Sequence, residues 1–249
     1  MIDIIGIDCS TNDKSVAVAV GRWGSGRTSV HRVVVCGGSA GRAADVILSC
    51  FRSGAPTLLA IDAPLGWPVA LAQSLIDHTA GVGIPADPNR LFRRDTDRIV
   101  KAMVNQQPLD VGADRIARTA HWALGLLEEL RTRSGKSIPL AWNAKDVTTL
   151  TAIEVYPAAT LTSRGIAAKA YKKKEQQSAR GTLLGALAGI MVLPDVAVFA
   201  QCADAIDAAV CVLAGADFIN GLCIMPIDAA VAKREGWIWV RSPELQTEA

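Results

Sequence analysis

The sequence predicts an α/β fold in which helices cover both faces of a mixed sheet of five strands. Three short apolar or alternating segments, at 2–9, 15–21 and 29–36, follow one another with only turns between them. A helical segment separates them from a fourth apolar strand at 57–62, which favours a parallel arrangement of that strand with the first. The later part of the chain is dominated by helical patterns, and a mixed sheet needs helices to cover its faces.

The first strand is β-branched and apolar, and Asp13-Lys14 makes the turn into the second. Gly24-Ser25-Gly26 is a strong turn signal before the third strand. A short amphipathic helix over 43–52 then leads to the fourth strand. These segments therefore predict a meander of two hairpins followed by a helical crossover.

The segment 63–145 interrupts this pattern with several prolines and glycines, and we expect an insertion or lid within one domain over 1–249. Apolar spacing predicts two helices in it, at 95–105 and 114–132. A fifth strand is expected at 151–156, stopped by Pro157. The remaining expected elements are helices at 169–190 and 203–214 and a short strand at 236–240.

Length and composition indicate a globular protein. The chain has 249 residues, of which half are hydrophobic and 5% aromatic, and its net charge of +2 does not identify a partner. The six cysteines form no CxxC pair and the three histidines are widely spaced, so a structural zinc site is not expected. The cysteines are expected to be reduced and buried.

We expect a cytoplasmic protein with no membrane contact. The N-terminus enters a strand directly, without the basic segment and cleavage site of a signal peptide. The longest apolar stretch, 183–194, has 12 residues and is too short to span a bilayer.

Four acidic residues lie in apolar surroundings. Asp8 ends the first strand and Asp62 ends the fourth, so both are expected at the carboxyl edge of adjacent parallel strands, where ligands bind. Asp204 and Asp207 share one face of an otherwise apolar helix. Each strand-end aspartate alone is explained equally well by loop capping, and a helix N-terminus explains Asp204 better than Asp207.

Burying several carboxylates together without a cation is unfavourable. Because Mg²⁺ and similar hard cations bind carboxylate oxygens, Asp8, Asp62, Asp204 and Asp207 predict a site for Mg²⁺ or Mn²⁺. Glu154, inside the fifth strand, is a further catalytic candidate, or else a strand residue that faces solvent. Nucleases with two metals need carboxylates from several elements, which this set supplies.

Three residues are candidate substrate contacts: Arg93, Arg94 and Trp67. Arg93 and Arg94 belong to a basic group around the first insertion helix that either contacts phosphate or forms a solvated helix face. A second basic group, containing Lys169, Lys172, Lys173, Lys174 and Arg180, is more typical of solvated charge. Trp67 is a candidate for stacking on a base, although a packed loop residue is the more common case.

Five motifs occur in a specific combination along nearly the whole chain. They are Gly6-Ile7-Asp8-Cys9-Ser10, Ala60-Ile61-Asp62-Ala63-Pro64-Leu65-Gly66-Trp67-Pro68, Arg93-Arg94-Asp95-Thr96-Asp97, Ile153-Glu154-Val155-Tyr156-Pro157 and Asp204-Ala205-Ile206-Asp207-Ala208. This combination resembles the DUF429 family, which is described as predicted nucleases with a ribonuclease-H-like fold. The resemblance implies strand order 3-2-1-4-5 with an antiparallel second strand. The placing of the acids is similar to Holliday-junction resolvases, which implies that Asp8, Asp62, Asp204 and Asp207 are the metal ligands.

We therefore expect a metal-dependent nuclease that acts on DNA or RNA. One alternative is an actin-like or sugar-kinase-like phosphotransferase, although such enzymes normally contain two copies of the core and glycine-rich phosphate loops. Another is a non-catalytic nucleic-acid-binding module, which the acids of segment 203–214 argue against. A homodimer is a further expectation, because single-copy nucleases that act on symmetric junctions are often dimers.

Overall fold

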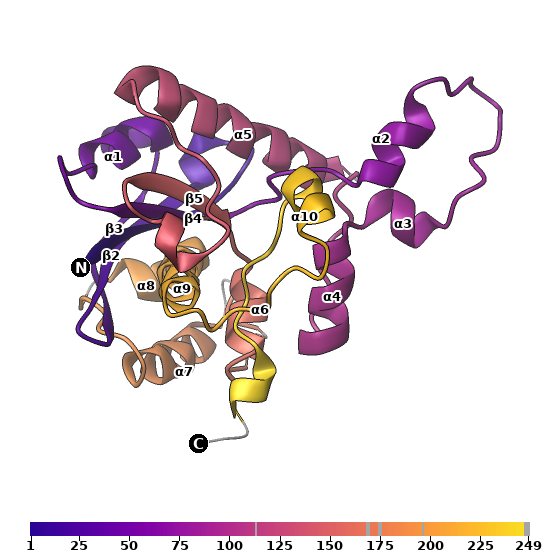
Figure 1. Cartoon of the computed structure of the whole chain (residues 1–249). Coiled ribbons are helices and arrows are strands. Elements are labelled where there is room, and N and C mark those ends of the chain that lie inside the picture. The colour runs from indigo at the N-terminus through magenta and orange to yellow at the C-terminus, as the bar shows by residue number, and fades with distance from the viewer. Residues whose placement is uncertain (113, 168–169, 174–175, 196, 247–249) are drawn as a thin grey trace.

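The computed structural model describes residues 1–112, 114–167, 170–173, 176–195 and 197–246. Its centre is one five-stranded sheet in the order β3-β2-β1-β4-β5 (Figure 1). Strand β2 is antiparallel to both of its neighbours, whereas β1, β4 and β5 are mutually parallel. The expected strand order and directions are confirmed. The strands are β1 (Ile2–Asp8), β2 (Ala17–Gly24), β3 (Arg27–Val35), β4 (Thr57–Asp62) and β5 (Leu150–Glu154).

The strand ends differ from the expected ones for local reasons. Strand β2 begins at Ala17 and not at residue 15, because a short 3-10 turn, Asp13–Ser15, precedes it and is capped by the side chain of Asn12. Strand β5 ends at Glu154, since Tyr156 already caps helix α6 (Pro157–Thr162). A proline in the first turn of a helix needs no backbone partner, which explains the abrupt change.

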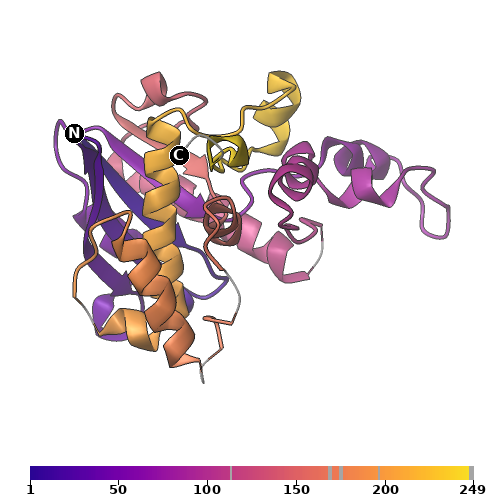
Figure 2. The ribbon, with the colours of Figure 1, turned by 90° about the horizontal axis from the view of Figure 1, so that it is seen from below.

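Helices cover both faces of the sheet. Helix α1 (Ala43–Ser49) and helix α5 (Asp114–Ser134) lie on one face. Helix α9 (Ala203–Ile219) lies on the other face, together with α6, α7 (Gln177–Ala188) and α8 (Val198–Gln201) (Figures 1 and 2). Successive apolar residues of β1 belong to two different cores, because Ile4 packs in the cluster on one face of the sheet and Ile5 packs in the cluster on the other.

Helix α9 packs unusually close to the sheet, and glycine makes this possible. A Cβ atom built on Gly6 of β1 would lie 2.1 Å from the carbonyl oxygen of Ala208. All residues of α9 from Ala205 to Ile219 are buried, including Asp207 and Asp217. The absence of a side chain at residue 6 therefore fixes the depth at which α9, and with it Asp207, sits against β1.

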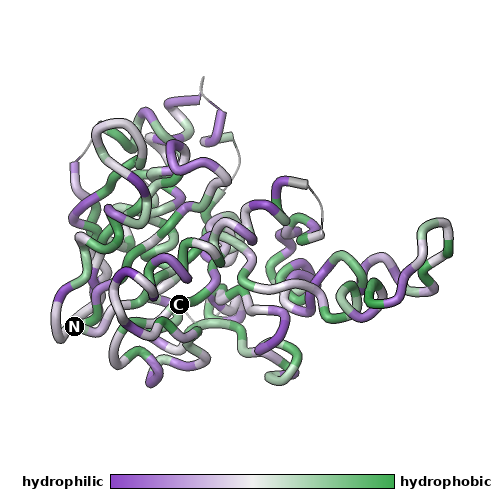
Figure 3. The backbone as a smooth tube through the Cα atoms, turned by 90° about the horizontal axis from the view of Figure 1, so that it is seen from above, coloured by the Kyte–Doolittle hydropathy of each residue, from purple (hydrophilic) through white to green (hydrophobic). Residues whose placement is uncertain are grey.

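The segment 63–145 divides into two parts. Its last helix, α5, packs on the sheet through Ala123, Leu127 and Leu130 and belongs to the core. The preceding α2 (Val69–Leu75) and α3 (Pro88–Phe92) form an arm, residues 69–92, that projects from the body (Figures 1 and 3). No residue of α2 is buried. Helix α4 (Asp95–Val104) joins the arm to the body.

Two expectations for the second half of the chain are wrong. A helix was expected over 169–190, but within the described residues helix occupies only Gln177–Ala188, and residues 170–173 form turns and bends. Lys169 and Lys174 of the second basic group lie outside the described residues. A strand was expected over 236–240, but only one bridge forms there, between Ile238 and Glu154, after helix α10 (Ala229–Glu235).

Among the described residues, none of the helices combines the length and the apolarity that a bilayer crossing requires.

The close packing of α9 on β1 predicts that any side chain at residue 6 destabilises the folded protein. We expect Gly6→Ala to lower the free energy of unfolding by about 1–3 kcal/mol or more, because overpacking displaces α9. Gly185→Ala is the matched control, since a Cβ there meets nothing within 4 Å and lies inside α7. That variant should be stabilised by up to about 1 kcal/mol. Urea denaturation measures both, and an unaffected Gly6→Ala would contradict the packing argument.

Candidate active site

The carboxyl edge of the sheet brings two aspartates together. Asp8 ends β1, Asp62 ends β4, and the two residues are opposite each other in the parallel register. Adjacent strands lie about 4.8 Å apart, so the two side chains share one short stretch of sheet edge. The expectation that Asp8 and Asp62 end adjacent parallel strands is confirmed. This is also the edge at which open sheets with parallel strands bind their ligands.

A third carboxylate reaches this edge from α9. The Asp207 side chain is 1% exposed, and its Oδ2 atom lies 2.8 Å from the Nζ atom of Lys172. The hydroxyl of the buried Tyr171 donates a hydrogen bond to Oδ1 of the same carboxylate. Asp204, one turn earlier and partly buried, raises the pKa of both Asp8 and Asp207 through its charge. Helix α9 therefore contributes one fully engaged carboxylate and a second one close by.

The electrostatics of the cluster favour a cation. Burial raises the pKa of Asp8 well above its ordinary value of 3.8, and the charge of Asp62 raises it further. Burial and the charge of Asp207 raise the pKa of Asp62 to about 7, although Lys172 and a hydrogen bond with Asp8 oppose this shift. Burial also raises the pKa of Asp207, against the opposing effect of Lys172. Negative charge is thus present in excess at this edge.

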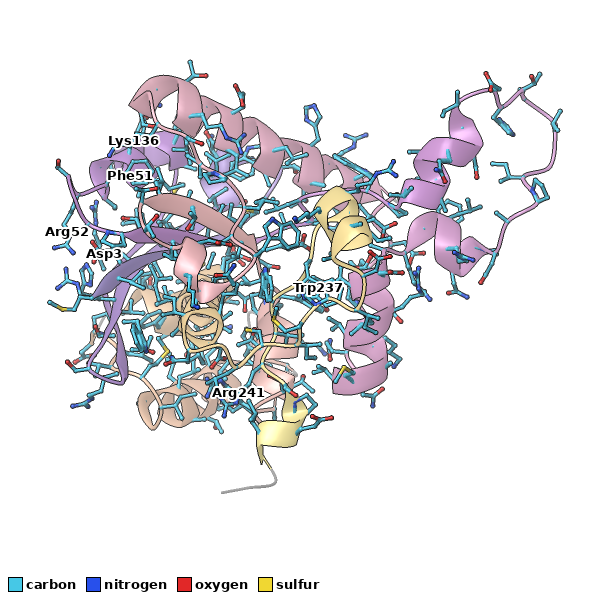
Figure 4. All side chains as sticks on the ribbon, viewed as in Figure 1. Asp3, Phe51, Arg52, Lys136, Trp237 and Arg241 are labelled. Carbon is cyan, nitrogen blue, oxygen red and sulfur yellow. The ribbon has the colours of Figure 1, made fainter. Side chains whose placement is uncertain are left out.

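The other end of β1 shows how this chain neutralises a buried acid when no ligand is involved. Asp3 is 4% exposed and pairs with Arg22 at 3.0 Å and with Arg52 (Figure 4). By contrast, no lysine or arginine of the described residues forms a salt bridge with Asp8 or Asp62. The two ends of the same strand therefore differ: one acid is satisfied within the chain, and the other faces open space.

That space is a cleft of about 490 Å³. Asp8 and Asp62 form part of its lining, with Glu154 and Arg94 also in the wall. The opening of the cleft is formed by exposed and partly buried residues and by the first turn of α5. The exposed residues are Thr11, Arg115 and Lys172, and the partly buried ones are Ser10 and Tyr156. The cleft therefore combines the carboxylates of Asp8 and Asp62 with hydroxyl groups and two exposed cations.

The donor chemistry of Asp8 and Asp62 fits a divalent cation, because a cation offsets the repulsion between adjacent carboxylates of like charge. The full set expected from the sequence is not assembled as a metal site, however. In the ranges that the structure describes, no group of three or more His, Cys, Asp or Glu side chains is arranged to hold a metal ion. Asp8 and Asp62 are the pair left for an ion, whereas Asp207 is already engaged by Tyr171 and Lys172.

Glu154 is engaged with a different partner. Its side chain is 3% exposed, and Oε1 and Oε2 accept hydrogen bonds from Nη2 and Nη1 of Arg94 at 2.7 and 2.8 Å. The backbone N–H of Leu65 donates to Oε2 at 2.9 Å. Glu154 contributes a smaller repulsion to Asp62, but this arrangement favours a positioning role over the catalytic one expected from the sequence.

Arg94 has no donor left for a phosphate. Its side chain is 1% exposed, and an arginine carries five N–H donors. The Nε and Nη2 atoms donate to Asp97, Nη1 and Nη2 donate to Glu154, and Nη1 also donates to the carbonyl oxygen of Glu235. All five donors are therefore used, which removes the basis for the expected phosphate contact of Arg94.

The other two expected substrate contacts lie apart from the cleft lining. Arg93 pairs with Asp110 at 2.8 Å and donates to Asn89 at 2.6 Å. Trp67 is partly buried in the loop between β4 and α2. Two other cations, Arg115 and Lys172, do line the cleft. Neither can be recognised from the sequence alone, because Arg115 belongs to no motif and Lys172 stands in a basic group typical of solvated charge.

Comparison with known proteins gives a family and no activity. The family described as "Protein of unknown function (DUF429)" matches residues 6–231. This range contains Asp8, Asp62, Glu154, Asp204 and Asp207. No curated protein and no solved structure matches the chain.

The Arg94 network predicts a large loss of stability when its centre is removed. We expect Arg94→Ala to lower the free energy of unfolding by about 3–5 kcal/mol, because Glu154 and Asp97 remain as buried unpaired charges. Arg93→Ala is the control at the next residue, where the partly exposed ion pair should contribute about 1 kcal/mol or less. Equal losses in urea denaturation would contradict the proposed difference between the two arginines.

The raised pKa of Asp62 predicts a pH dependence of stability in the metal-free protein. The folded state keeps a proton up to about pH 7, whereas the unfolded chain releases it near the ordinary value of 3.8. Between these values the folded state binds more protons, so the free energy of unfolding falls as the pH rises. Asp62→Asn should flatten this decline. Urea denaturation from pH 4 to pH 8 in the presence of a chelator tests it, and parallel curves would argue against a raised pKa.

Proposed function

Because the chain belongs to the DUF429 family, whose description assigns no function, we propose an activity from its cleft: a divalent-metal-dependent phosphodiesterase that hydrolyses nucleic acid. The observation that carries this proposal is the pairing of Asp8 with Asp62. Two carboxylates lie opposite each other at the ligand-binding edge of a parallel pair, with no salt bridge to either among the described residues. Asp3, on the same strand, has two arginine partners.

A divalent cation fits this pair, since it would offset the repulsion that raises the pKa of both carboxyl groups. When bound, Mg²⁺ or Mn²⁺ supplies Lewis acidity to a phosphate oxygen and lowers the pKa of water. The part of the protein is to fix Asp8 and Asp62 on two hydrogen-bonded strands. The burial of their surroundings strengthens the electrostatic attraction for the cation.

Recognition of phosphate is assigned to the open side of the cleft. Arg115 is exposed on the first turn of α5, and Lys172 is also exposed and lines the same cleft. Arginine and lysine bind phosphate oxygens in nucleic acids, and the hydroxyls of Ser10 and Thr11 are suited to the same contact. These residues take the phosphate-binding role that was expected of Arg94. The reason for proposing a nucleic-acid substrate is the resemblance to ribonuclease-H-like nucleases, which implies the same sheet order as the one observed.

Cytoplasmic location and a homodimer also remain proposals. Reduced cysteines fit a reducing compartment, and all six cysteines are free in the structure. A dimer would place two clefts on one substrate. Size-exclusion chromatography with light scattering tests it directly.

The activity is tested with a panel of single-stranded, duplex, hybrid and branched DNA and RNA in Mg²⁺ or Mn²⁺. We expect the wild type to cut at least one substrate, and Asp8→Asn to lose nearly all metal-dependent hydrolysis while keeping its circular dichroism spectrum. Asp110→Asn is a control outside the cleft lining and should retain activity. If the wild type cuts nothing in the panel, the nuclease proposal fails, and binding of ATP is then measured to test a phosphotransferase.

The phosphate contact is tested by binding, separately from cutting. Arg115→Ala should weaken the binding of a cleaved substrate and lower the slope of log affinity against log salt by about one, because one phosphate contact is lost. Lys136→Ala, an exposed lysine away from the cleft, should leave the slope unchanged. Equal slopes in the two variants would remove Arg115 from the phosphate contacts.

A further inference from the structure

A lysine ammonium group is already present in the carboxylate cluster. The Nζ atom of Lys172 lies 2.8 Å from Oδ2 of Asp207, and the residue also lines the cleft. The Lys172 side chain is 60% exposed, whereas that of Asp207 is 1% exposed. An exposed lysine normally forms weak ion pairs because it loses conformational freedom. Something else must therefore hold this lysine at the cluster.

The backbone on both sides of Lys172 is fixed by a buried arginine. Arg180 of α7 is 3% exposed, and its Nη1 atom donates to the carbonyl oxygens of Tyr171 and Lys173, each at 2.9 Å. Its Nε atom donates to the carbonyl oxygen of Ala200 at 2.8 Å. Because the carbonyl groups of the two residues that flank Lys172 are both anchored, the lysine leaves the backbone at a fixed place beside Asp207.

Tyr171 completes the arrangement from the same segment. Its side chain is buried, and its hydroxyl donates to Oδ1 of Asp207. Both oxygens of Asp207 are thus occupied by consecutive residues, Oδ1 by Tyr171 and Oδ2 by Lys172. A metal ion at Asp207 would lie beside the ammonium group of Lys172, whose positive charge opposes it. Asp8 and Asp62 carry no such contact with a cationic side chain among the described residues.

Sites with two metals hold their cations roughly 3.5–4 Å apart, bridged by shared carboxylates. We propose that the ammonium group of Lys172 occupies one of these two cation positions, so that the site takes a single divalent ion, between Asp8 and Asp62. This inference rests on the proposed function for the identity of that ion. Lys172 then presents a fixed positive charge to the phosphate from the Asp207 side of the cleft.

The test counts manganese ions bound to the full chain, by calorimetric titration with MnCl₂ in the absence of substrate. The wild type should bind one ion. Lys172→Ala frees Asp207, next to Asp204, and should bind two, whereas Lys172→Arg keeps the charge and should bind one. Lys173→Ala is the matched control, since it removes a neighbouring exposed lysine, and should bind one. Circular dichroism confirms that each variant is folded.

The outcomes separate this inference from the function on which it rests. Two ions in the wild type, or one in both the wild type and Lys172→Ala, would overturn the role of Lys172 and leave a metal-dependent enzyme standing. If no ion binds to the wild type, both the inference and the metal-dependent function are overturned. Should Lys172→Ala lose its fold, Lys172→Met replaces it, because the methionine keeps most of the apolar stem without the charge.

Discussion

The buried guanidinium of Arg94 is the interaction on which the architecture around the cleft depends. It joins three elements that are far apart in the sequence: α4 through Asp97, β5 through Glu154 and the end of α10 through the carbonyl oxygen of Glu235. Removing such a charge from water is costly unless every donor is satisfied, and here all five are. The network is therefore stable only when all three elements are in place, which couples their positions.

The same network fixes the loop that follows Asp62. Glu154 accepts the N–H of Leu65, and the carboxylate of Glu235 accepts the N–H of Val69 at 2.7 Å and of Asp95 at 2.8 Å. One acid thus holds the first residue of the arm and the first residue of α4, which follows the arm. The space around this centre is full, because a Cβ at Gly236 would lie 2.9 Å from Oε2 of Glu154. Trp237, the next residue, lies between α9 and α4 in the view of Figure 4. These contacts fix the loop after Asp62 and so help to hold Asp62 opposite Asp8.

The sequence was sufficient for the parts of the structure that depend on local patterns. Alternation and turn residues predicted the five strands, and the crossover rule predicted that β1 and β4 are parallel, which placed Asp8 beside Asp62. The partners of Arg94 could not be predicted, since Glu154 and Glu235 lie 60 and 141 residues away along the chain. Arg94 and Arg93 look alike in the sequence, and only tertiary burial distinguishes them. The role of Lys172 depends in the same way on Arg180, whose contacts hold residues 170–173 out of the expected helix.

The position of α9 in the chain has a consequence for synthesis on the ribosome. Strands β1 to β3 are complete by residue 35, yet the helix that covers one of their faces begins only at Ala203. At a synthesis rate of roughly 5–20 residues per second, this apolar face stays exposed for on the order of 10–30 s before α9 can pack on it. Nascent chains with such a delay expose hydrophobic surface and a strand edge, the surfaces that chaperones bind. Strands β1 to β3 are therefore made well before the helix that buries one of their faces, and the yield of the protein in a cell should depend on what shields that face during the interval.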